Sequence, residues 1–396
     1  MGDKIMGNQR KKVVVLGAGA AGIMAANRLR KSFRADDVGI TVIDREDKHY
    51  YQPGYLTLAF HMDTPESLVR DTRKLLVNDI TFRQDEATGI DVDSRAVQLR
   101  NGDLPYDYLI IATGLTYADE APEGLRSGLE LKKKVFNFYT LQGALALRDA
   151  LDDFNGGTIV SSITEMPIRC PAAPTEFILL CADTLRRRGL LKKTRLVVTV
   201  PAPFVPPQME PFKSYVRKRL DDNGIEVLTE FKPIRIDGAA GTYEDSAGRK
   251  LTFDLMAVVP PNRGEPVVKG VDGLTDQAGW VIANKETLQV ERARNIFVIG
   301  DASNFPNPKT AAASRKEAQV LRARLTATLQ SKEPSALYDG ETICPVLTDF
   351  GHAFFVHFNY TRALRQVKED RATYYLHVYL LKYFYWDYIL KGNLFK

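Results

Sequence analysis

Cys170 stands where a thiol could become reactive. It lies a few residues before a predicted helix, residues 174–188, whose first turn contains Pro174 and Glu176. A helix N-terminus stabilises a nearby thiolate and so lowers the pKa of the thiol. Glu176 has two interpretations: an acid that favours the first turn of a helix, which we place slightly ahead, or a proton acceptor for the thiol.

The other two cysteines have different surroundings. Cys181 shares one side of the same helix with apolar residues, a spacing typical of a core position. Cys344 lies in residues 338–351, after a long helical segment at residues 310–329. For a lone cysteine the simplest interpretation is a buried apolar residue. A redox role for Cys344 therefore needs a further argument, which is given below.

A glycine-rich turn follows the first predicted strand, residues 11–16, and precedes an alanine-rich helix at residues 23–33. Its glycines are Gly17, Gly19 and Gly22. They allow a tight turn, close approach to a pyrophosphate and close helix packing. Asp44 ends the next strand, where a ribose hydroxyl needs an acceptor. The pattern predicts a dinucleotide site on a βαβ unit.

A second α/β unit begins at the predicted strand 158–163, but its turn lacks the glycines that bind a nicotinamide nucleotide. Residues 161–174 read Ser-Ser-Ile-Thr-Glu-Met-Pro-Ile-Arg-Cys-Pro-Ala-Ala-Pro. The following strand, 195–200, ends in Val200 and Pro201 rather than in an acidic ribose partner. NAD(P)H is therefore disfavoured at this turn, and Cys170 takes its place.

Two later motifs resemble signatures of the flavoproteins with two dinucleotide-binding domains. They are residues 108–114, Tyr-Leu-Ile-Ile-Ala-Thr-Gly, and residues 296–301, Ile-Phe-Val-Ile-Gly-Asp. In that superfamily the aspartate after the glycine holds the ribityl chain, so the resemblance implies FAD as the cofactor. The additional candidates for binding it are Pro53, Thr113, Gly114, Gly300 and Asp301.

The chain from Val13 to its C-terminus resembles the sulfide:quinone oxidoreductases. In that family the redox cysteines occupy a Cys-Pro segment in place of the NADH turn and a late segment of the type Tyr-Asp-Gly-x-x-x-Cys, which are Cys170 and Cys344 here. Pro308-Lys309-Thr310 also matches, and the resemblance puts Lys309 at the pyrimidine side of the flavin, where a cation stabilises reduced flavin. Residues 136–142 hold no third cysteine, which leaves covalent attachment of the flavin in doubt.

The resemblance implies oxidation of sulfide to sulfane sulfur or polysulfide. Hydrosulfide would attack a disulfide or sulfur bridge between Cys170 and Cys344, and two electrons would pass through FAD to a membrane quinone. Two alternatives remain open: a type II NADH:quinone dehydrogenase, which needs the missing glycine turn, and a flavin-binding scaffold or signalling protein without sulfide chemistry. The quinone type, sulfur acceptor and product length stay undetermined.

The last two dozen residues are crowded with aromatic side chains, lysines and leucines. They include Tyr374, Tyr375, Tyr379, Tyr383, Phe384, Tyr385, Trp386 and Tyr388. One interpretation is a core or dimerisation helix. The other, supported by Lys382 and Lys391, is an interfacial membrane helix. In the resembled family this end docks on the bilayer and lines the quinone pocket, which makes Phe384 a candidate quinone contact.

Composition bounds the remaining properties. The chain has 396 residues and a net charge of +5 that is spread along its length, so nucleic acid is not implied. Three cysteines favour a reducing compartment. No export signal or membrane span is found in the sequence. The five histidines do not have the spacing of metal ligands. The sequence is compatible with a homo-oligomer. We expect a peripheral, monotopic protein on the cytoplasmic face of a membrane.

The expected fold class is α/β, with two Rossmann-like domains and a C-terminal amphipathic membrane-binding segment. The expected domains are residues 1–120 and 274–332 for FAD binding, 121–273 for the second Rossmann-like domain, and 333–396 for the membrane and quinone region. Residues 118–128 read as a linker.

Overall fold

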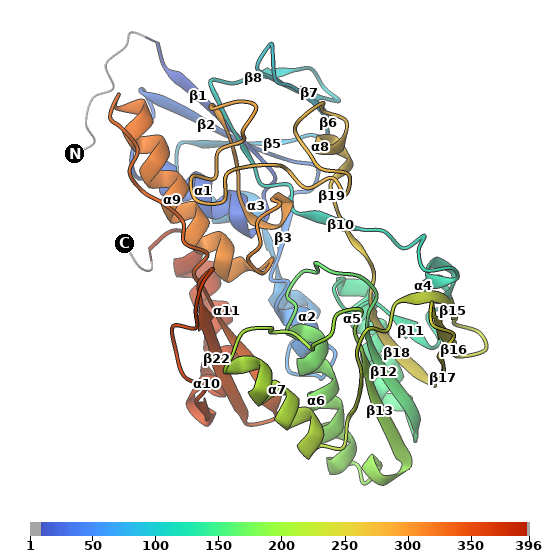
Figure 1. Cartoon of the computed structure of the whole chain (residues 1–396). Coiled ribbons are helices and arrows are strands. Elements are labelled where there is room, and N and C mark those ends of the chain that lie inside the picture. Colours follow the sequence, from blue (N-terminus) through green and yellow to red (C-terminus); the bar gives the residue numbers. More distant parts are fainter. Residues whose placement is uncertain (1–8, 394–396) are drawn as a thin grey trace.

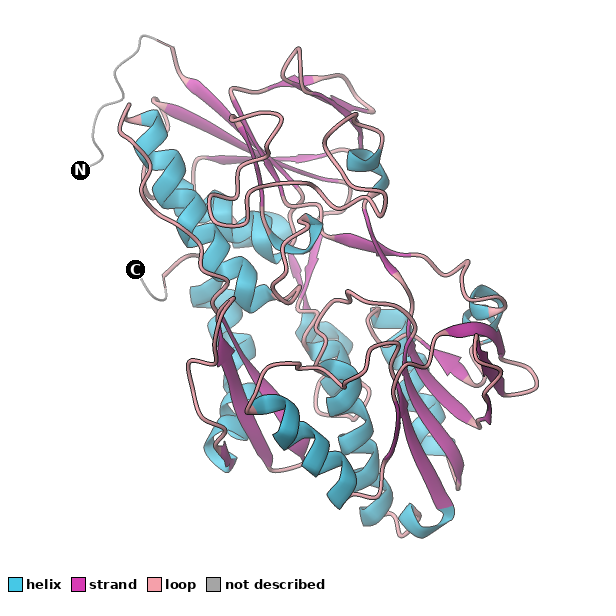
Figure 2. Cartoon of the chain, in the orientation of Figure 1, coloured by secondary structure: helices cyan, strands magenta, loops and turns pink. Residues whose placement is uncertain are grey.

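The apolar runs of the sequence form two five-stranded sheets, which Figures 1 and 2 show with the helices beside them. The computed structural model of the chain describes residues 9–393. The first sheet has the order β20-β9-β1-β2-β5 and is parallel throughout. Its strands are β1 (Lys11–Leu16), β2 (Val38–Asp44), β5 (Ile80–Gln84), β9 (Tyr108–Ile111) and β20 (Ile296–Val298). Near-continuous apolar runs suit strands that are covered on both faces.

Two helices that are far apart in the sequence, α1 (Ala20–Arg30) and α9 (Ala311–Leu329), lie side by side next to the first sheet (Figure 1). Helix α1 begins three residues earlier than the sequence predicts. The reason is Gly22, which lies inside the helix: an added Cβ there would stand 1.9 Å from the carbonyl oxygen of Gly17. Absence of a side chain lets the first turn of α1 close against the glycine turn.

The second sheet has the order β11-β18-β12-β13-β14 and is also parallel. Its strands are β11 (Val135–Phe136), β12 (Gly157–Ile163), β13 (Thr194–Thr199), β14 (Glu226–Leu228) and β18 (Leu255–Val259). Its helices are α5 (Leu141–Asp153), α6 (Ala173–Arg187) and α7 (Phe212–Asp222). The chain passes between the two sheets along β10 (Leu115–Tyr117) and β19 (Asn262–Gly264), which pair antiparallel (Figure 1).

Shorter helices and strands pack around the two sheets. Near the first sheet are β3 (Lys48–Tyr50), β4 (Val69–Asp71), α3 (Thr72–Leu75), β6 (Ala87–Asp91), β7 (Ala96–Leu99), β8 (Leu104–Pro105) and α8 (Pro266–Lys269). Near the second are α2 (Gly54–Leu58), which contacts α5, and α4 (Leu125–Leu131), β15 (Pro233–Asp237), β16 (Thr242–Asp245) and β17 (Lys250–Thr252). The expectation of a plain linker at residues 118–128 is wrong at its end, because α4 begins at Leu125, whose side chain is buried.

The C-terminal part forms a three-stranded antiparallel sheet and then a helical tail. The strands are β21 (Thr342–Asp349), β22 (His352–Phe358) and β23 (Glu369–Asp370). The tail runs through α10 (Arg371–Tyr375) and α11 (Leu381–Phe384), with π-helical turns at Leu376–Leu380 and Tyr385–Ile389. Among the described residues no helix is long and apolar enough to cross a membrane.

The tail is anchored on the first half of the chain. The side-chain amide of Asn27 donates to the carbonyl oxygen of Leu390 (2.9 Å), and Lys31 donates to that of Lys391 (2.6 Å). Lys382 binds the carboxylate of Asp63, and its side chain is only 14% exposed. The expectation that Lys382 serves as an interfacial anchor is therefore wrong: its charge is already paired inside the protein.

Candidate functional site

The candidate cofactor residues collect at one edge of the first sheet. The strands β1, β2, β9 and β20 are parallel, so the residues that follow them meet at their carboxyl ends, where open α/β sheets bind ligands. These residues are Gly17, Gly19, Asp44, Thr113, Gly114, Gly300 and Asp301. Pro53 comes directly before α2, beyond β3. The structure thus brings together positions almost 290 residues apart in the chain.

The glycine turn has the geometry of a dinucleotide cradle. Gly17 has φ +105°, and an added Cβ there would stand 2.4 Å from the carbonyl oxygen of Ala112. A Cβ at Gly19 would meet nothing within 4 Å, so space is open beside the N-terminus of α1. The amide of Ala18 donates to Asp44 (2.7 Å), which fixes that carboxylate at the turn. The hydroxyl of Thr113 is buried without a hydrogen-bond partner in the described protein. These features fit FAD.

Arg169 and Lys309 both engage Asp301. The guanidinium Nε of Arg169 donates to the carboxylate of Asp301 (2.7 Å), and a Cβ on Gly114 would lie 3.6 Å from the same guanidinium. Lys309 donates to the carbonyl oxygens of Asp301 (3.0 Å) and Ser303 (2.7 Å). Burial lowers the pKa of Lys309 to about 8. Backbone oxygens hold the ammonium group of Lys309, and its place at the pyrimidine side of the flavin stays a prediction.

The two candidate cysteines reach this region from different elements. The amide of Cys170 donates to the carbonyl oxygen of Lys309 (2.9 Å), and the hydroxyl of Tyr139 donates to the carbonyl oxygen of Cys170 (3.0 Å). Cys170 has φ +42°, a left-handed conformation that is uncommon outside glycine and worth inspection at a functional site. Cys344 lies on β21, where the hydroxyls of Thr310 and Thr342 bond its sulfur.

Glu176 stands between these two segments. It is 4% exposed in the first turn of α6, and its carboxylate accepts the amide of Leu347 on β21 (2.8 Å). Burial raises the pKa of Glu176 to about 7. The charge of Glu176 acts on both Cys170 and Cys344, and the charge of Cys344 also acts on Cys170. The structure therefore groups Glu176 with both cysteines.

The expected lowering of the Cys170 thiol pKa is wrong for this structure. Burial raises the pKa of Cys170 well above its usual range, and the charges of Glu176 and Cys344 add to that rise, which exceeds the opposing effect of the Ala173 amide. Burial also raises the pKa of Cys344 to about 11. Cys170, Cys181 and Cys344 are free thiols here, and Cys181 is fully buried, which confirms its core position.

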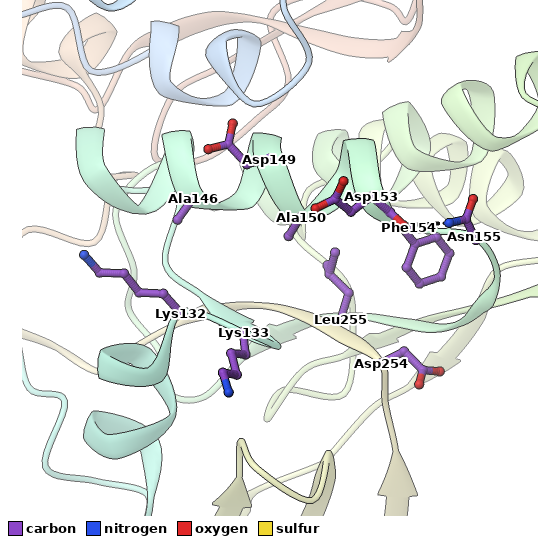
Figure 3. A pocket seen from close by; sticks show the side chains of 10 residues that line it. All are labelled: Lys132, Lys133, Ala146, Asp149, Ala150, Asp153, Phe154, Asn155, Asp254 and Leu255. Atoms are coloured by element: carbon purple, nitrogen blue, oxygen red, sulfur yellow. Dashed lines mark hydrogen bonds between the residues drawn. The ribbon is translucent and has the colours of Figure 1, made fainter.

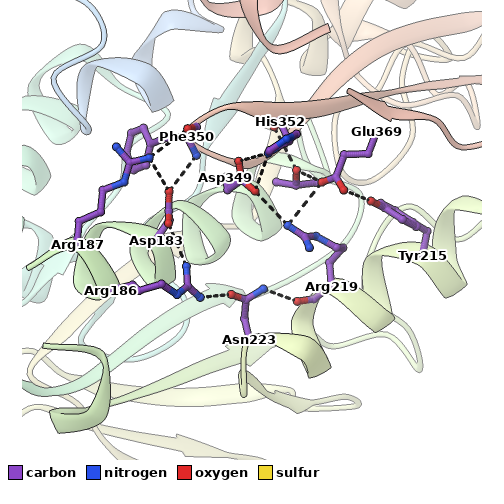
Figure 4. A network of polar contacts seen from close by, with 11 residues as sticks. Asp183, Arg186, Arg187, Tyr215, Arg219, Asn223, Asp349, Phe350, His352 and Glu369 are labelled. Atoms are coloured by element: carbon purple, nitrogen blue, oxygen red, sulfur yellow. Dashed lines mark hydrogen bonds and ion pairs between the residues drawn. The ribbon is translucent and has the colours of Figure 1, made fainter. Parts of the chain in front are cut away.

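A polar network holds the β21–β22 hairpin against α6 and α7 (Figure 4). Arg219 on α7 pairs with Asp349 (3.3 Å) and Glu369 (3.5 Å), while the hydroxyl of Tyr215 donates to Glu369 (2.6 Å). On α6, Asp183 accepts the amide of Phe350 (3.1 Å). The hairpin that contains Cys344 is thus tied at its far end to the helix that contains Glu176.

Phe384 lies on the exposed side of the tail. Its ring is 37% exposed and packs beside Tyr388, with ring centroids 5.9 Å apart. The next two side chains, Tyr385 and Trp386, turn inward instead and are each 4% exposed. The hydroxyl of Tyr385 hydrogen-bonds Nε2 of His49 (2.6 Å).

His49 connects the tail to the glycine turn, since its Nδ1 bonds the carbonyl oxygen of Ala18 (2.9 Å). Sequence reasoning missed this contact, and it missed Arg169 and the buried carboxylate of Glu317. A sequence signal existed only for Arg169, which directly precedes Cys170.

One surface pocket lies elsewhere, beside α5 of the second sheet (Figure 3). It has a volume of about 490 Å³ and is lined by side chains of mixed charge, including Lys132, Lys133, Asp149, Asp153 and Asp254. None of the candidate cofactor or cysteine residues lines it. The pocket is therefore separate from the candidate site.

Comparison with known proteins agrees with this geometry. Residues 11–164 match the family model of the pyridine nucleotide-disulphide oxidoreductases. A mitochondrial sulfide:quinone oxidoreductase of Mus musculus is 27% identical over 96% of this chain and 86% of its own length. A type II NADH:quinone oxidoreductase of Staphylococcus aureus is 24% identical over 86% of this chain and 88% of its own.

Among solved structures, the sulfide:quinone oxidoreductase of Aquifex aeolicus superposes with a TM-score of 0.86 at 23% identity, covering 97% of this chain and 92% of that one. These similarities confirm the predicted resemblance to the sulfide:quinone oxidoreductases and the α/β fold. They also confirm a flavin-dependent oxidoreductase with FAD as its cofactor.

Proposed function

We propose that this protein oxidises sulfide to sulfane sulfur or polysulfide and transfers two electrons through Cys170, Cys344 and FAD to a membrane quinone. The observation that carries the proposal is the turn after β12. In a nicotinamide-binding domain this turn offers glycines and free amides to a diphosphate. Here the amides of Arg169 and Cys170 already donate to Asn262 (2.8 Å) and Lys309 (2.9 Å).

The first turn of α6 argues further against a second nucleotide. A diphosphate is attracted to a helix N-terminus because the helix dipole is positive there. Glu176 is buried in the first turn of this helix and so puts a carboxylate at the end that would have to receive the phosphates. This acid disfavours a second anion, and its charge acts on the two thiols Cys170 and Cys344.

The residue roles follow from the sulfur chemistry. Oxidation of HS⁻ to the S⁰ level releases two electrons and one proton. Sulfide attacks a bridge between Cys170 and Cys344, so that one cysteine becomes a persulfide and the other leaves as a thiolate. FAD, when bound at the carboxyl edge of the first sheet, accepts the two electrons. Glu176 is the nearby base for the proton, and Lys309 contributes positive charge at the cofactor site.

Anaerobic mixing with each reductant tests this function. We expect sulfide to bleach the flavin absorbance within seconds and NADH at micromolar concentration to leave it oxidised, because the second nucleotide turn is absent. Stopped-flow absorbance of the FAD-loaded protein measures both. Rapid bleaching by NADH and none by sulfide would favour the type II NADH:quinone dehydrogenase, whereas bleaching by neither would favour a scaffold.

Glu176→Gln should slow sulfide-dependent bleaching by about 10²- to 10⁴-fold, the usual contribution of a general base. Because the carboxylate form predominates above about pH 7, the ratio of wild-type to variant rates should rise through pH 7 and then level off. Taking the ratio at each pH removes the ionisation of sulfide itself. Glutamine can still accept the amide of Leu347, so the fold should persist; a ratio that stays constant across pH would contradict the role of base.

We expect the quinone to approach along the tail. We infer that it contacts the buried Trp386 and the adjacent ring of Tyr51 rather than the exposed Phe384, which the sequence suggested. Tyr51 and Trp386 pack with ring centroids 6.2 Å apart. The hydroxyl of Tyr51 and the indole nitrogen of Trp386 are buried without hydrogen-bond partners among the described residues. Tyr51 also interacts electrostatically with Cys344. Two unsatisfied polar groups in an aromatic cluster suit the carbonyl oxygens of a quinone.

A further inference from the structure

A buried carboxylate, Glu317, lies behind the turn that contains Asp301. It belongs to α9 and is fully buried. Its Oε2 accepts the amide of Gly300 (2.6 Å) and its Oε1 accepts the side-chain amide of Asn307 (3.1 Å). No ion pair to Glu317 occurs in the described part of the chain at salt-bridge distance. A charge buried so deeply without an ion-pair partner costs folding free energy, so a functional reason for this carboxylate is worth seeking.

The Gly300 amide points at α9 because of its backbone conformation. Gly300 has φ +72°, and an added Cβ would stand 2.9 Å from the side chain of Ala21 and 3.3 Å from that of Ser314. The turn is therefore fitted closely between α1 and α9. Any change of charge on Glu317 acts directly on the residue before Asp301.

Lys309 contacts the same turn through different backbone atoms. Its ammonium group donates to the carbonyl oxygens of Asp301 and Ser303 and stands 3.9 Å from the centroid of the Trp280 ring. Two opposite charges therefore contact the turn: Glu317 accepts a backbone amide, and Lys309 donates to backbone carbonyl oxygens.

We propose that Glu317 is a charge-tuning residue that binds one proton when the flavin is reduced and so makes the flavin potential depend on pH. The inference deepens the proposed function, but it rests only on FAD being bound and not on sulfide or quinone. Two electrons enter the flavin from any reductant, and one proton from solvent binds the Glu317 carboxylate. Added negative charge at the flavin attracts that proton.

The groups around Glu317 support this behaviour. Burial raises the pKa of Glu317 to about 7, against the hydrogen bonds from Gly300 and Asn307. The charge of Asp301 raises it further and that of Lys309 lowers it. Tyr338 and Tyr360 also interact with Glu317, and burial keeps the pKa of both phenols above their usual value, so neither is charged near neutral pH. Asp276 and Arg169 act on Lys309.

The pH window follows from these values. Below about pH 7 Glu317 is protonated whether the flavin is oxidised or reduced, so it adds nothing to the pH dependence. Above pH 7 the oxidised protein has the carboxylate, and reduction raises its pKa and draws in the proton. One proton for two electrons changes the equilibrium constant tenfold per pH unit, which is about 30 mV.

Glu317→Gln tests the proposal. The side-chain oxygen of glutamine can still accept the Gly300 amide. Its new NH2 group needs an acceptor, and a flip of the Asn307 side chain supplies one, because the Oδ1 of Asn307 has no partner in the described protein. Spectroelectrochemistry of the FAD-loaded variants with mediator dyes, from pH 6 to 9, measures the midpoint potential. We expect the variant to match wild type at pH 6 and to be increasingly more positive above pH 7. Curves that coincide, or that differ by a constant offset, would overturn the proposal.

Three further variants keep the result interpretable. Lys309→Met should shift the potential in the opposite direction, and Asn307→Ala should move the bend in the curve to higher pH, because the carboxylate loses a donor. Glu286→Gln removes an exposed carboxylate near Tyr360 and should leave the curve unchanged. If Glu317→Gln loses FAD, an unmoved bend in Asn307→Ala would by itself overturn the proposal. Because no sulfide is used, failure of the proposed function would not affect these measurements.

Discussion

Cys170→Ala and Cys344→Ala should each lower sulfide-dependent quinone reduction by at least about a thousandfold, while both variants retain FAD. Removal of a nucleophile leaves only the catalysis that comes from binding and electrostatics. Both thiols share the neighbourhood of Glu176, yet they come from different elements, one before α6 and one on β21. Neither side chain is needed for the glycine turn, so the flavin spectrum should stay normal.

Cys181→Ala is the matched control. This thiol is fully buried on the same helix as Glu176, and its removal should cost on the order of 1 kcal/mol of folding stability with nearly normal activity. Stopped-flow bleaching and thermal unfolding of the three variants separate the two effects. An inactive Cys181→Ala alongside an active Cys344→Ala would show that the wrong cysteines had been paired.

The cofactor edge of the first sheet was predictable because its signals are local. The glycines, Asp44 and the residues after β9 and β20 each follow an apolar strand, and parallel strands bring their carboxyl ends together. Helix α1 was misplaced by three residues at both ends. Its start was missed because a glycine inside a helix looks like part of a turn until the carbonyl of Gly17 is seen against it.

The ionic contacts of the site could not be predicted, because their partners are distant in sequence. Arg169 and Asp301 are 132 residues apart, and Glu176 meets the amide of Leu347 across 171 residues. The pKa of Cys170 was misjudged for the same reason. A helix N-terminus is visible in the sequence, whereas burial and a neighbouring carboxylate appear only after folding.

For the helical tail, the sequence shows which residue types are present but not which side chains point toward the protein. Its aromatic content was evident, but two π-helical turns shift the side-chain spacing, so a regular 3.6-residue period assigns the faces wrongly. The outward face contains Tyr375, Tyr379, Leu380, Tyr383, Phe384 and Tyr388, and the inward face contains Tyr374, Val378, Tyr385, Trp386 and Leu390. The inward face agrees with the interpretation of a core helix, whereas the interfacial helix stays a prediction that concerns the outward face.

Replacing Tyr375, Tyr379 and Tyr383 together by serine should weaken binding to quinone-containing lipid vesicles by at least about a hundredfold. These rings are 55%, 53% and 63% exposed, and they make no hydrogen bond in the described structure. If each buries on the order of 50 Å² of apolar surface at about 25 cal/mol per Å², the three contribute about 4 kcal/mol to binding. Sedimentation with vesicles measures the affinity, and sulfide-dependent bleaching should remain normal.

Deletion from Ala372 onward, which the sequence alone would suggest as the test of the tail, should instead unfold part of the FAD half. It removes Tyr385, whose partner His49 holds the carbonyl of Ala18 in the glycine turn, and Leu390, whose carbonyl binds Asn27. We therefore expect the truncated protein to lose FAD, whereas the triple serine variant keeps it. A truncated protein that retains FAD would contradict the structural role of the inward face. A triple variant that binds vesicles like wild type would contradict the membrane-binding role of the outward face.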